Sequence, residues 1–475
     1  MKNKIFLILT GFVFIFISSC TKDFDAINTN PNNPDSAPIE NVFAYTIKSV
    51  SSCFGTTEME TAAGYVGHVT KGKYTDITTY TSPPSSGVWN VIYRTTASNA
   101  NFVISEAKKT ENFNLLGATM VLKVYVMQLA TDIYGKVPYT EAGLGNDGII
   151  YPAYDTEQAI YYDMLAKLDT ANDLLINNPQ NGNFEDGDLL YEGNITKWKK
   201  FCNSLHLRLA IRISNIDESK ASSEISKIID NPDKYPIFES NADNAFLAYP
   251  GEDWVEPWTA RHSAIGVDWM AKPIIDTLLN YSDPRIAFYA DSLSDGTYIG
   301  LTVGEEAETT SYSRVNDLFV NNPTGSVFFL KYAEVEFIIA EAAKRGFITA
   351  DAQTAYENAI TASCEEYGIS SGDISTYLAG SDVAWNDDIN KIYIQKWISL
   401  FRQSWEAWAE MRRTDIPTLP PAANSNYSGH NRPPFRFPYP DSEVMLNSDN
   451  IPQDVNEDDN YWGYQIWWDT RTNVQ

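Results

Sequence analysis

Basic residues are scarce in this sequence. Its 475 residues include 35 lysines and arginines against 62 aspartates and glutamates, which gives a formal net charge of −27. Proteins that bind nucleic acids need a basic surface to contact phosphates, so this class of function is excluded. The same imbalance argues against attachment to anionic lipids through a basic patch.

Cysteine and histidine are also rare, with four of each. Four cysteines are too few for a disulfide scaffold in a chain of this length, and Cys53, Cys202 and Cys364 are far apart, so we expect buried thiols. No two histidines have the spacing of a zinc-binding helix, and no serine-hydrolase elbow motif occurs. The sequence therefore predicts no metal and no cofactor, it shows no common serine-hydrolase signature, and it predicts that His206 is structural.

The sequence has no run of 18 consecutive apolar residues, so it predicts no helix that spans a membrane. Its longest apolar stretch covers residues 5–17 and follows Lys2 and Lys4. Thirteen residues are too few to cross a bilayer comfortably, and a short apolar run after basic residues is typical of a signal peptide.

A cysteine follows this run at the point where cleavage is expected. Ile17-Ser18-Ser19-Cys20 resembles the lipobox of bacterial lipoproteins, in which the chain is cut before the cysteine and its thiol is lipidated. The alternative is an ordinary signal peptide with a coincidental cysteine. Cleavage after residue 19 removes two lysines, so the mature chain of 456 residues would have a net charge of −29. Lipidation anchors a protein to a membrane without spanning it.

The rest of the chain is organised as a tether and one domain. Residues 20–38 are polar and rich in asparagine and proline, which predicts a flexible tether from the lipid to the body. Residues 39–475 are predicted to form a single helical domain with long inserted loops. The hydrophobic fraction of 43% is sufficient for a large core.

Helical periodicity dominates that domain and predicts an all-α fold. Apolar residues recur at helical spacing, with glycines or proline at several of the ends. The predicted helices cover residues 118–134, 156–176, 195–214, 331–345, 351–367 and 389–413.

Two of these predicted helices are separated by about five residues and carry small side chains that allow close approach. Residues 331–345 and 351–367 therefore resemble a tetratricopeptide helical hairpin, although no strict 34-residue repeat is present. We expect such hairpins to support a face of long loops with minor β-hairpins. The long segments that lack helical periodicity are residues 66–90, 177–194, 232–268, 289–328 and 415–470.

Aromatic residues are abundant, at 13% of the chain, and some lie in these segments. A Trp or Tyr ring can cover the apolar face of a sugar while neighbouring polar groups bind its hydroxyls. The alternative is that these tryptophans pack in the core. The candidate ligand-binding residues are Trp89, Asn90, Trp254, Trp258, Arg261 and Trp269.

Three other patterns are weak. Residues 67–73 match the first seven positions of a phosphate-binding loop, but Tyr74 replaces the required Ser or Thr, so we interpret them as a surface loop. Asp291 to Gly296 resembles a calcium loop but lacks its alternating ligands, and the question of a structural calcium stays open. With 62 acidic residues, a glycosidase pair is possible by composition, but no motif indicates one.

Taken together, the chain resembles the SusD/RagB family of surface lipoproteins of Bacteroidota, and its start resembles the SusD-like-2 subgroup. The resemblance covers nearly all of the mature chain. Its carriers are Cys20 followed by Asp23 to Asn32; Trp89 to Tyr93 with Asn99; Asp132 to Ala142; Gly187-Asp188 with Trp198, Phe201, Asn203, Leu205 and Arg208; Phe329 to Val335 with Ala340 to Ala342; Gln395 to Trp397; Trp405 to Trp408; and Arg432 to Pro440.

The resemblance implies a helical, tetratricopeptide-like protein that is lipid-anchored in the outer membrane and faces outward. It further implies that the chain is not an enzyme, and that it captures oligosaccharides for a SusC-like, TonB-dependent β-barrel transporter. Asp23 and Asp25 are similar to the surface-export signal of such lipoproteins. Trp89 and Asn90 are the nearest positional match to the binding edge of the family. The alternatives are a peptide-capturing or mainly transporter-covering protein and, third, a surface glycosidase.

Overall fold

The computed structural model describes residues 37–55, 57–81, 85–265, 268–307, 310–427, 429–452 and 464–474. The predicted signal peptide (1–19), the lipidation site Cys20 and the tether up to residue 36 lie outside the described residues.

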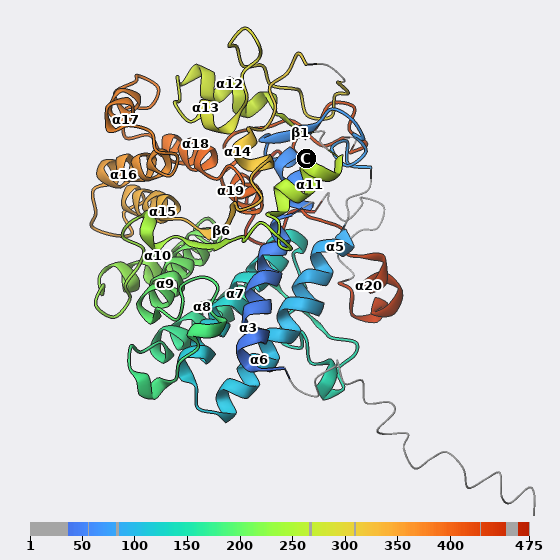
Figure 1. Cartoon of the computed structure of the whole chain (residues 1–475), viewed down its shortest axis with the longest axis vertical. Helices are drawn as coiled ribbons and strands as arrows, with labels where there is room; N and C mark the ends of the chain where they lie inside the picture. The colour runs from blue at the N-terminus through green and yellow to red at the C-terminus, as the bar shows by residue number, and fades with distance from the viewer. Residues whose placement is uncertain are drawn as a thin grey trace, which may run out of the picture.

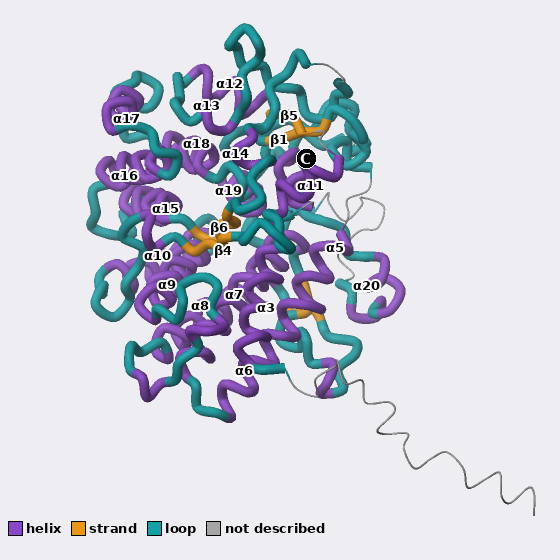
Figure 2. The backbone as a smooth tube through the Cα atoms, in the orientation of Figure 1, coloured by secondary structure: helices purple, strands orange, loops and turns teal. Residues whose placement is uncertain are grey.

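Helices make up most of the described chain (Figures 1 and 2). The longer ones are α3 (Ile39–Ser51), α6 (Ser98–Lys109), α7 (Phe113–Tyr134), α8 (Glu157–Leu174), α9 (Ile195–Arg212), α10 (Glu218–Ile229), α11 (Pro257–Ile265), α12 (Lys272–Asn280), α15 (Tyr332–Lys344), α16 (Ala352–Glu365), α17 (Ser371–Leu378), α18 (Ile389–Ser399) and α19 (Ser404–Thr414). Short α-helices are α4 (Ala63–Tyr65), α5 (Ser85–Asn90), α13 (Ile286–Tyr289), α14 (Asp317–Val320) and α20 (Asp441–Leu446). Two π-helical segments are η2 (Glu58–Ala62) and η3 (Val91–Ala97). The 3₁₀ turns are η1 (Ser52–Phe54), η4 (Gly145–Asp147), η5 (Pro179–Asn181), η6 (Glu185–Gly187), η7 (Asn241–Asp243) and η8 (Ser448–Asn450).

Six short strands form three antiparallel pairs in the described part of the chain. They are β1 (Val69–Lys71) with β5 (Asp268–Met270), β2 (Val137–Pro138) with β3 (Tyr154–Asp155), and β4 (Ala245–Ala248) with β6 (Ser326–Leu330). In the first and third pairs, the partners are far apart in sequence. These two pairs therefore join distant segments of the chain and are not the hairpins that the sequence predicts.

The helical frame consists of antiparallel neighbours along the chain. Helix α7 packs on α8, α8 on α9, and α9 on α10, and a second group pairs α15 with α16 (Figure 1). Asparagine, threonine or aspartate side chains cap the starts of α7, α8, α9, α10 and α16 by accepting a backbone N–H of the first turn. The all-α prediction with tetratricopeptide-like hairpins is confirmed.

Five of the six predicted helices occur within a few residues of their predicted ends, as α7, α8, α9, α15 and α16. Local signals explain this agreement. Gly135 ends α7 and Gly346 follows α15, and both adopt the positive φ that glycine tolerates best. Cys53, Cys202 and Cys364 are free and buried, which confirms the prediction for the thiols.

The prediction of one long helix over 389–413 is wrong. The segment divides into α18 and α19, and Arg402 between them has a φ of +66°. The carboxylate of Glu58, in distant η2, accepts the backbone N–H of Ser404 at 2.6 Å. This contact caps the start of α19 from another part of the chain, so no local periodicity could reveal it.

Helix α7 is long and apolar enough to cross a membrane by composition alone. In this protein it is a core helix, since 83% of its most apolar 18-residue window is buried inside the fold. It lies between α6 and α8 (Figure 1).

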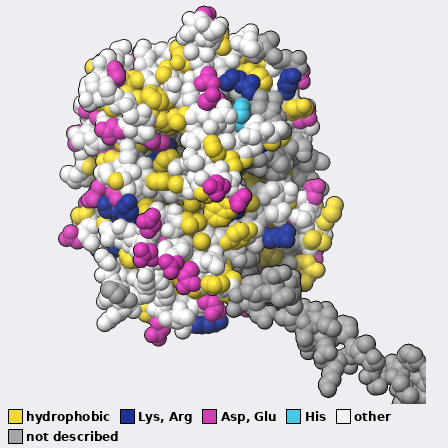
Figure 3. All heavy atoms as spheres, viewed as in Figure 1, with side chains coloured by type: hydrophobic (Ala, Val, Ile, Leu, Met, Phe, Trp, Pro, Cys, Tyr) yellow, Lys and Arg dark blue, Asp and Glu magenta, His cyan; other side chains and the backbone are white. Residues whose placement is uncertain are grey.

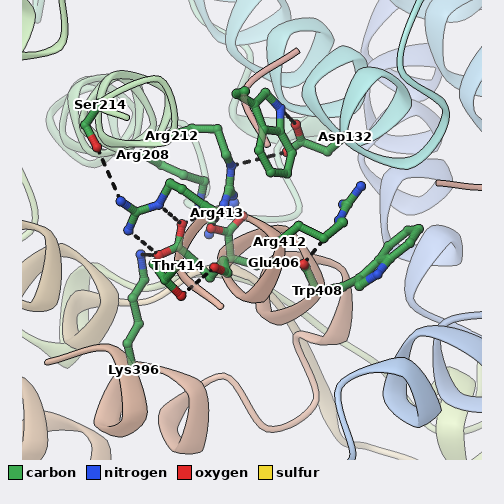
Figure 4. Close-up of polar contacts among 12 residues, drawn as sticks. Asp132, Arg208, Arg212, Ser214, Lys396, Glu406, Trp408, Arg412, Arg413 and Thr414 are labelled. Carbon is green, nitrogen blue, oxygen red and sulfur yellow. Dashed lines mark hydrogen bonds and ion pairs between the residues drawn. The ribbon is translucent and has the colours of Figure 1, made fainter. Parts of the chain in front are cut away.

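A buried ion network joins the two groups of helices (Figure 4). It links α7 and α9 of one group to α15, α18 and α19 of the other. Its bonds include those from Arg208 to Glu334 at 2.6 Å, and from Arg413 to Glu341 at 2.6 Å. The members are Asp132, Glu334, Glu341, Glu406, Glu410, Arg208, Arg212, Lys396 and Arg413, and Arg345 joins them at the rim.

Paired opposite charges make this network tolerable in a dry core. Burial raises the pKa of Glu410, but Arg413, Lys396 and Arg212 offset this effect and hold it well below its usual range. Several members, including Asp132, Arg208 and Glu406, also carried the family resemblance. Those residues therefore define the core of the fold rather than a ligand site. His206 is likewise buried against Glu224, which agrees with a structural role.

Candidate functional site

Helix α11 carries two of the predicted ligand-binding residues. Residues 257–265 were expected to form part of a loop, but they are helical and pack on η2. Trp258 donates its Nε1–H to Glu58 at 2.9 Å, and Arg261, one turn later, forms an ion pair with Glu60. The two bonds fix α11 on η2.

The prediction that Trp258 lies on a ligand-facing loop is wrong. Its side chain is 1% exposed, and its ring contacts Phe401 and the guanidinium of Arg402. The reason is the buried carboxylate of Glu58, which provides the partner that an indole N–H needs in a core. Trp258 therefore belongs to the core and holds α11 in place.

Trp89 is also packed. Its ring is 5% exposed and lies between those of Tyr93, Tyr134 and Tyr439, with a centroid distance of 4.4 Å to Tyr93. A ligand contact by Trp89 stays a prediction, and it would require the ring to leave this packing. Asn90 follows it at the end of α5 and is exposed, so its amide can reach a ligand.

Trp254 is half-buried on the segment before α11. The ammonium of Lys48, in the last turn of α3, lies 4.1 Å from the centre of its ring. This cation covers one face of the indole, so a sugar could stack only on the opposite face. Its ligand contact also stays a prediction.

Trp269 lies in the β1–β5 strand pair, and Arg261 is linked to β1 through Glu60, which also pairs with Lys71. Thr70 of β1 pairs with Trp269 of β5, and Arg314 bridges to Trp269 from the other side. The guanidinium of Arg314 lies 4.2 Å from the centre of the Trp269 ring, which leaves the indole 4% exposed. We name this group, Glu60, Lys71, Tyr74, Arg261, His262, Asp268, Trp269 and Arg314, the β1–β5 cluster.

Charges in the β1–β5 cluster are arranged as neighbours of opposite sign. Lys71 donates to Glu60 at 3.2 Å, and Nδ1 of His262 lies 2.9 Å from Oδ2 of Asp268, to which it donates when it carries the proton. Burial lowers the pKa values of Lys71 and Arg261, while the carboxylate of Asp268 acts in the opposite direction on both. In the space-filling view, basic side chains and a histidine gather at this end of the face (Figure 3).

Tyr74 is the most exposed aromatic residue of the cluster, at 67%. Tyr74 is not among the ligand-binding residues predicted from the sequence, where it stands out only as the residue that breaks the phosphate-loop pattern. The ammonium of Lys71 lies 5.9 Å from its ring centre, and its φ is +55°, an uncommon value for a bulky residue. The chain approaches the site closely at Gly72, where a Cβ would come within 3.0 Å of the Trp269 ring.

Two buried polar atoms of the cluster, and one of the neighbouring Thr70, have no hydrogen-bond partner among the described residues. They are Thr70 Oγ1, Arg261 Nε and Trp269 Nε1. An unsatisfied buried polar group costs about 1–3 kcal/mol, and native proteins usually satisfy such groups with water or another partner. Bound water is the usual partner of such atoms.

The arrangement suits binding rather than covalent chemistry. A glycosidase of the usual kind needs one protonated carboxylic acid beside an ionised one. Here Glu60 accepts from Lys71 and Arg261, and it is 5% exposed, as is Asp268. The exposed member is the ring of Tyr74, whereas Arg261 and Arg314 are half-buried and Lys71 is buried. No group of three or more His, Cys, Asp or Glu that could hold a metal occurs within the described ranges.

Comparison with known proteins agrees with this fold. The SusD-like 2 family model, described as "Starch-binding associating with outer membrane", matches residues 31–440. The chain belongs to this SusD-like family. No curated protein sequence matches this SusD-like chain significantly.

Solved structures of SusD homologues resemble this SusD-like chain over almost their whole length. A chitin-binding SusD homologue from Flavobacterium johnsoniae is 25% identical, with a TM-score of 0.80, and the match covers 91% of this chain and 99% of that one. A SusD homologue from Bacteroides uniformis is 26% identical, with a TM-score of 0.77 and coverage of 90% and 99%. A structure described as a chitin-binding protein is 26% identical, with a TM-score of 0.80 and coverage of 91% and 100%.

Proposed function

We propose that this SusD-like chain captures oligosaccharides at the cell surface and delivers them to a TonB-dependent outer-membrane transporter. Membership of a carbohydrate-binding family and the composition of the β1–β5 cluster support this function together. The single observation that carries the placement of the ligand is the exposed ring of Tyr74 beside cationic and unsatisfied polar groups.

The cluster offers the two kinds of contact that a neutral sugar needs. The outward face of Tyr74 is available for the apolar CH face of a pyranose ring, and the ammonium of Lys71 lies near the ring. Arg314 and Arg261 can donate to sugar hydroxyls from fixed positions, because the former stacks on Trp269 and the latter is held by Glu60.

This geometry favours binding of the oligosaccharide without a catalysed reaction. The carboxylates of the cluster are buried acceptors that position cations, and no free pair of them faces an exposed ring. The chain then acts as a binding protein and not as an enzyme, which accords with the character of its family.

Anchoring through Cys20 and export to the surface rest on the sequence pattern described above. The family description places its members in association with the outer membrane, which supports the same location. A lipid on a tether of some eighteen residues would leave the helical body mobile near the membrane. That freedom fits a protein that covers and uncovers a SusC-like transporter.

Titration with neutral oligosaccharides tests the site. Chitin oligosaccharides are the first probe, since two of the similar structures are described as chitin-binding, and maltooligosaccharides are the second. We expect Tyr74→Ala to weaken binding about 10- to 100-fold, since loss of a sugar-stacking ring is comparable to loss of other aromatic stacking contacts at 1–3 kcal/mol. Its melting temperature should not change.

Tyr151→Ala is the matched control. Tyr151 is similarly exposed, at 60%, and lies on the segment before β3, outside the cluster. Affinity should remain unchanged in this variant. Equal losses in the two variants, or unchanged binding in Tyr74→Ala, would show that the glycan site lies elsewhere.

A further inference from the structure

A second feature of the surface lies away from the β1–β5 cluster, between α6, α7 and α8 in the lower part of Figure 1. These helices and the segment after β2 enclose a groove of about 330 Å³. Pockets for small molecules start near this size. Its lining combines apolar side chains with three lysines: Ile104, Met120, Val124, Lys108, Lys123 and Lys167.

Lys123 has an unusual position for a charged residue. It lies in the middle of α7, whose only other charged residue is Asp132 in the buried ion network. Lys123 forms no ion pair with any described residue, and it donates from its Nζ to Oδ1 of Asn101 at 2.7 Å. A half-buried ammonium that makes no ion pair costs free energy that an apolar residue would not, so Lys123 is a candidate for ligand binding.

The surroundings hold Lys123 ready for a ligand. Asn101 donates its Nδ2–H to the carbonyl of Ala142 at 2.9 Å, which fixes its amide so that Oδ1 faces the ammonium. An ammonium has three donors, and Asn101 uses one of them. Two N–H groups therefore remain for a ligand in the groove.

The groove is electropositive in a chain whose net charge is −27. Its three lysines face a single carboxylate, Asp163, and that group is already engaged. It accepts from the hydroxyl of Tyr139 at 2.7 Å and lies 3.9 Å from the ammonium of Lys167. Burial and the neighbouring cations of Lys167 and Lys108 lower the pKa of Lys123 to about 8, although the carboxylate of Asp163 acts in the opposite direction. Binding of an anion would relieve this unfavourable accumulation of charge.

We infer that this groove binds a carboxylate-bearing sugar unit, such as a uronic acid, through Lys123 with the support of Lys108 and Lys167. The apolar side chains of Ile104, Met120 and Val124 would contact the CH face of the ring. The anionic part of the inference stands on the three lysines of the groove, which face one carboxylate that is already engaged. The saccharide part rests on the proposed glycan-capture function.

Isothermal titration with galacturonate and galactose tests the inference, because the two sugars differ only in the carboxylate at C6. At low salt we expect measurable binding of galacturonate and none of galactose in this groove. Lys123→Gln should weaken galacturonate binding about 10- to 100-fold, the range of a lost hydrogen bond to a charged group. Lys109→Gln is the control, since Lys109 is an exposed neighbour on α6 that pairs with Glu106.

A purely structural role for Lys123 would appear in stability. Lys123→Met should leave the melting temperature of the free protein unchanged or raise it, because a charge without a partner is removed, and it should abolish galacturonate binding. A lowered melting temperature with unchanged galacturonate affinity would overturn the inference.

Two further measurements distinguish a sugar carboxylate from other anions, and this groove from the β1–β5 cluster. Inorganic phosphate that binds as tightly as galacturonate would overturn the sugar assignment. Tyr74→Ala should keep galacturonate binding while it loses neutral oligosaccharides, so a failure of either site is distinguishable from a failure of the other.

Discussion

The buried carboxylate of Glu58 provides a direct test of how the site is supported. Glu58 is 0% exposed and accepts from the indole of Trp258 and from the backbone of Ser404, so it links η2, α11 and α19. Burial raises its pKa from 4.5 to about 7, despite these two hydrogen bonds and the nearby Arg402, which act in the opposite direction. Helix α11, which carries Arg261, depends on this contact.

The raised pKa of Glu58 predicts that the free energy of unfolding falls as the pH increases. Between the unfolded pKa of 4.5 and the folded pKa of about 7, the folded protein binds more protons at this site than the unfolded chain. The free energy of unfolding contributed by Glu58 is therefore fully present below pH 4.5 and is lost as the pH rises through 7. The loss amounts to roughly 3 kcal/mol, at about 1.4 kcal/mol for each tenfold change.

Comparison with Glu58→Gln isolates this group from the many others that titrate. The amide cannot ionise, and it resembles the protonated acid in shape, although its NH2 group has two donors where the acid has one. We expect urea denaturation between pH 4.5 and 8 to give a difference between variant and wild type that shifts by roughly 3 kcal/mol in favour of the variant. A constant difference across this range would refute the assignment of the raised pKa to Glu58.

Two further changes have expected outcomes. Arg212→Met removes the partner of Glu406 and Glu410 in the buried ion network, and it should lower the free energy of unfolding in urea denaturation by about 3–5 kcal/mol. The surface control Lys109→Met should change this free energy by less than about 1 kcal/mol. Equal effects of the two substitutions would contradict the structural role of the network. Cys20→Ser should release the protein from the membrane fraction of expressing cells, and retention of the variant there would contradict the predicted lipid anchor.

Much of the fold could be predicted from the sequence, because its determinants are local. Helices α7, α8, α9, α15 and α16 follow from apolar spacing and from caps that lie within a few residues. The break between α18 and α19 could not be predicted, since the carboxylate that caps Ser404 comes from Glu58, 346 residues earlier in the chain.

The site was harder to predict for the same reason. Tryptophans in loop-like segments looked available to ligands, but Trp258 finds a buried partner in Glu58, and Trp89 is covered by tyrosines from distant segments. Exposure depends on those distant partners. Tyr74, by contrast, carried a visible signal, because an aromatic residue closed a glycine-containing loop in which neither a strand core nor a helix was expected.

Lys123 carried an equally visible signal. A single lysine in the middle of an otherwise apolar helix is costly wherever that helix is buried, and the sequence alone showed this pattern. What it could not show is that Asn101 accepts the hydrogen bond of this lysine, because that contact is made across to α6.

The most direct test of glycan capture without chemistry is a calorimetric titration of the mature protein with chitin oligosaccharides, followed by mass analysis of the recovered ligand. The account predicts saturable binding with one neutral-glycan site per chain and recovery of every oligosaccharide at its original length. Shortened products would indicate a glycosidase, and the absence of binding to chitin and malto-oligosaccharides alike would contradict capture of neutral glycans by the β1–β5 cluster.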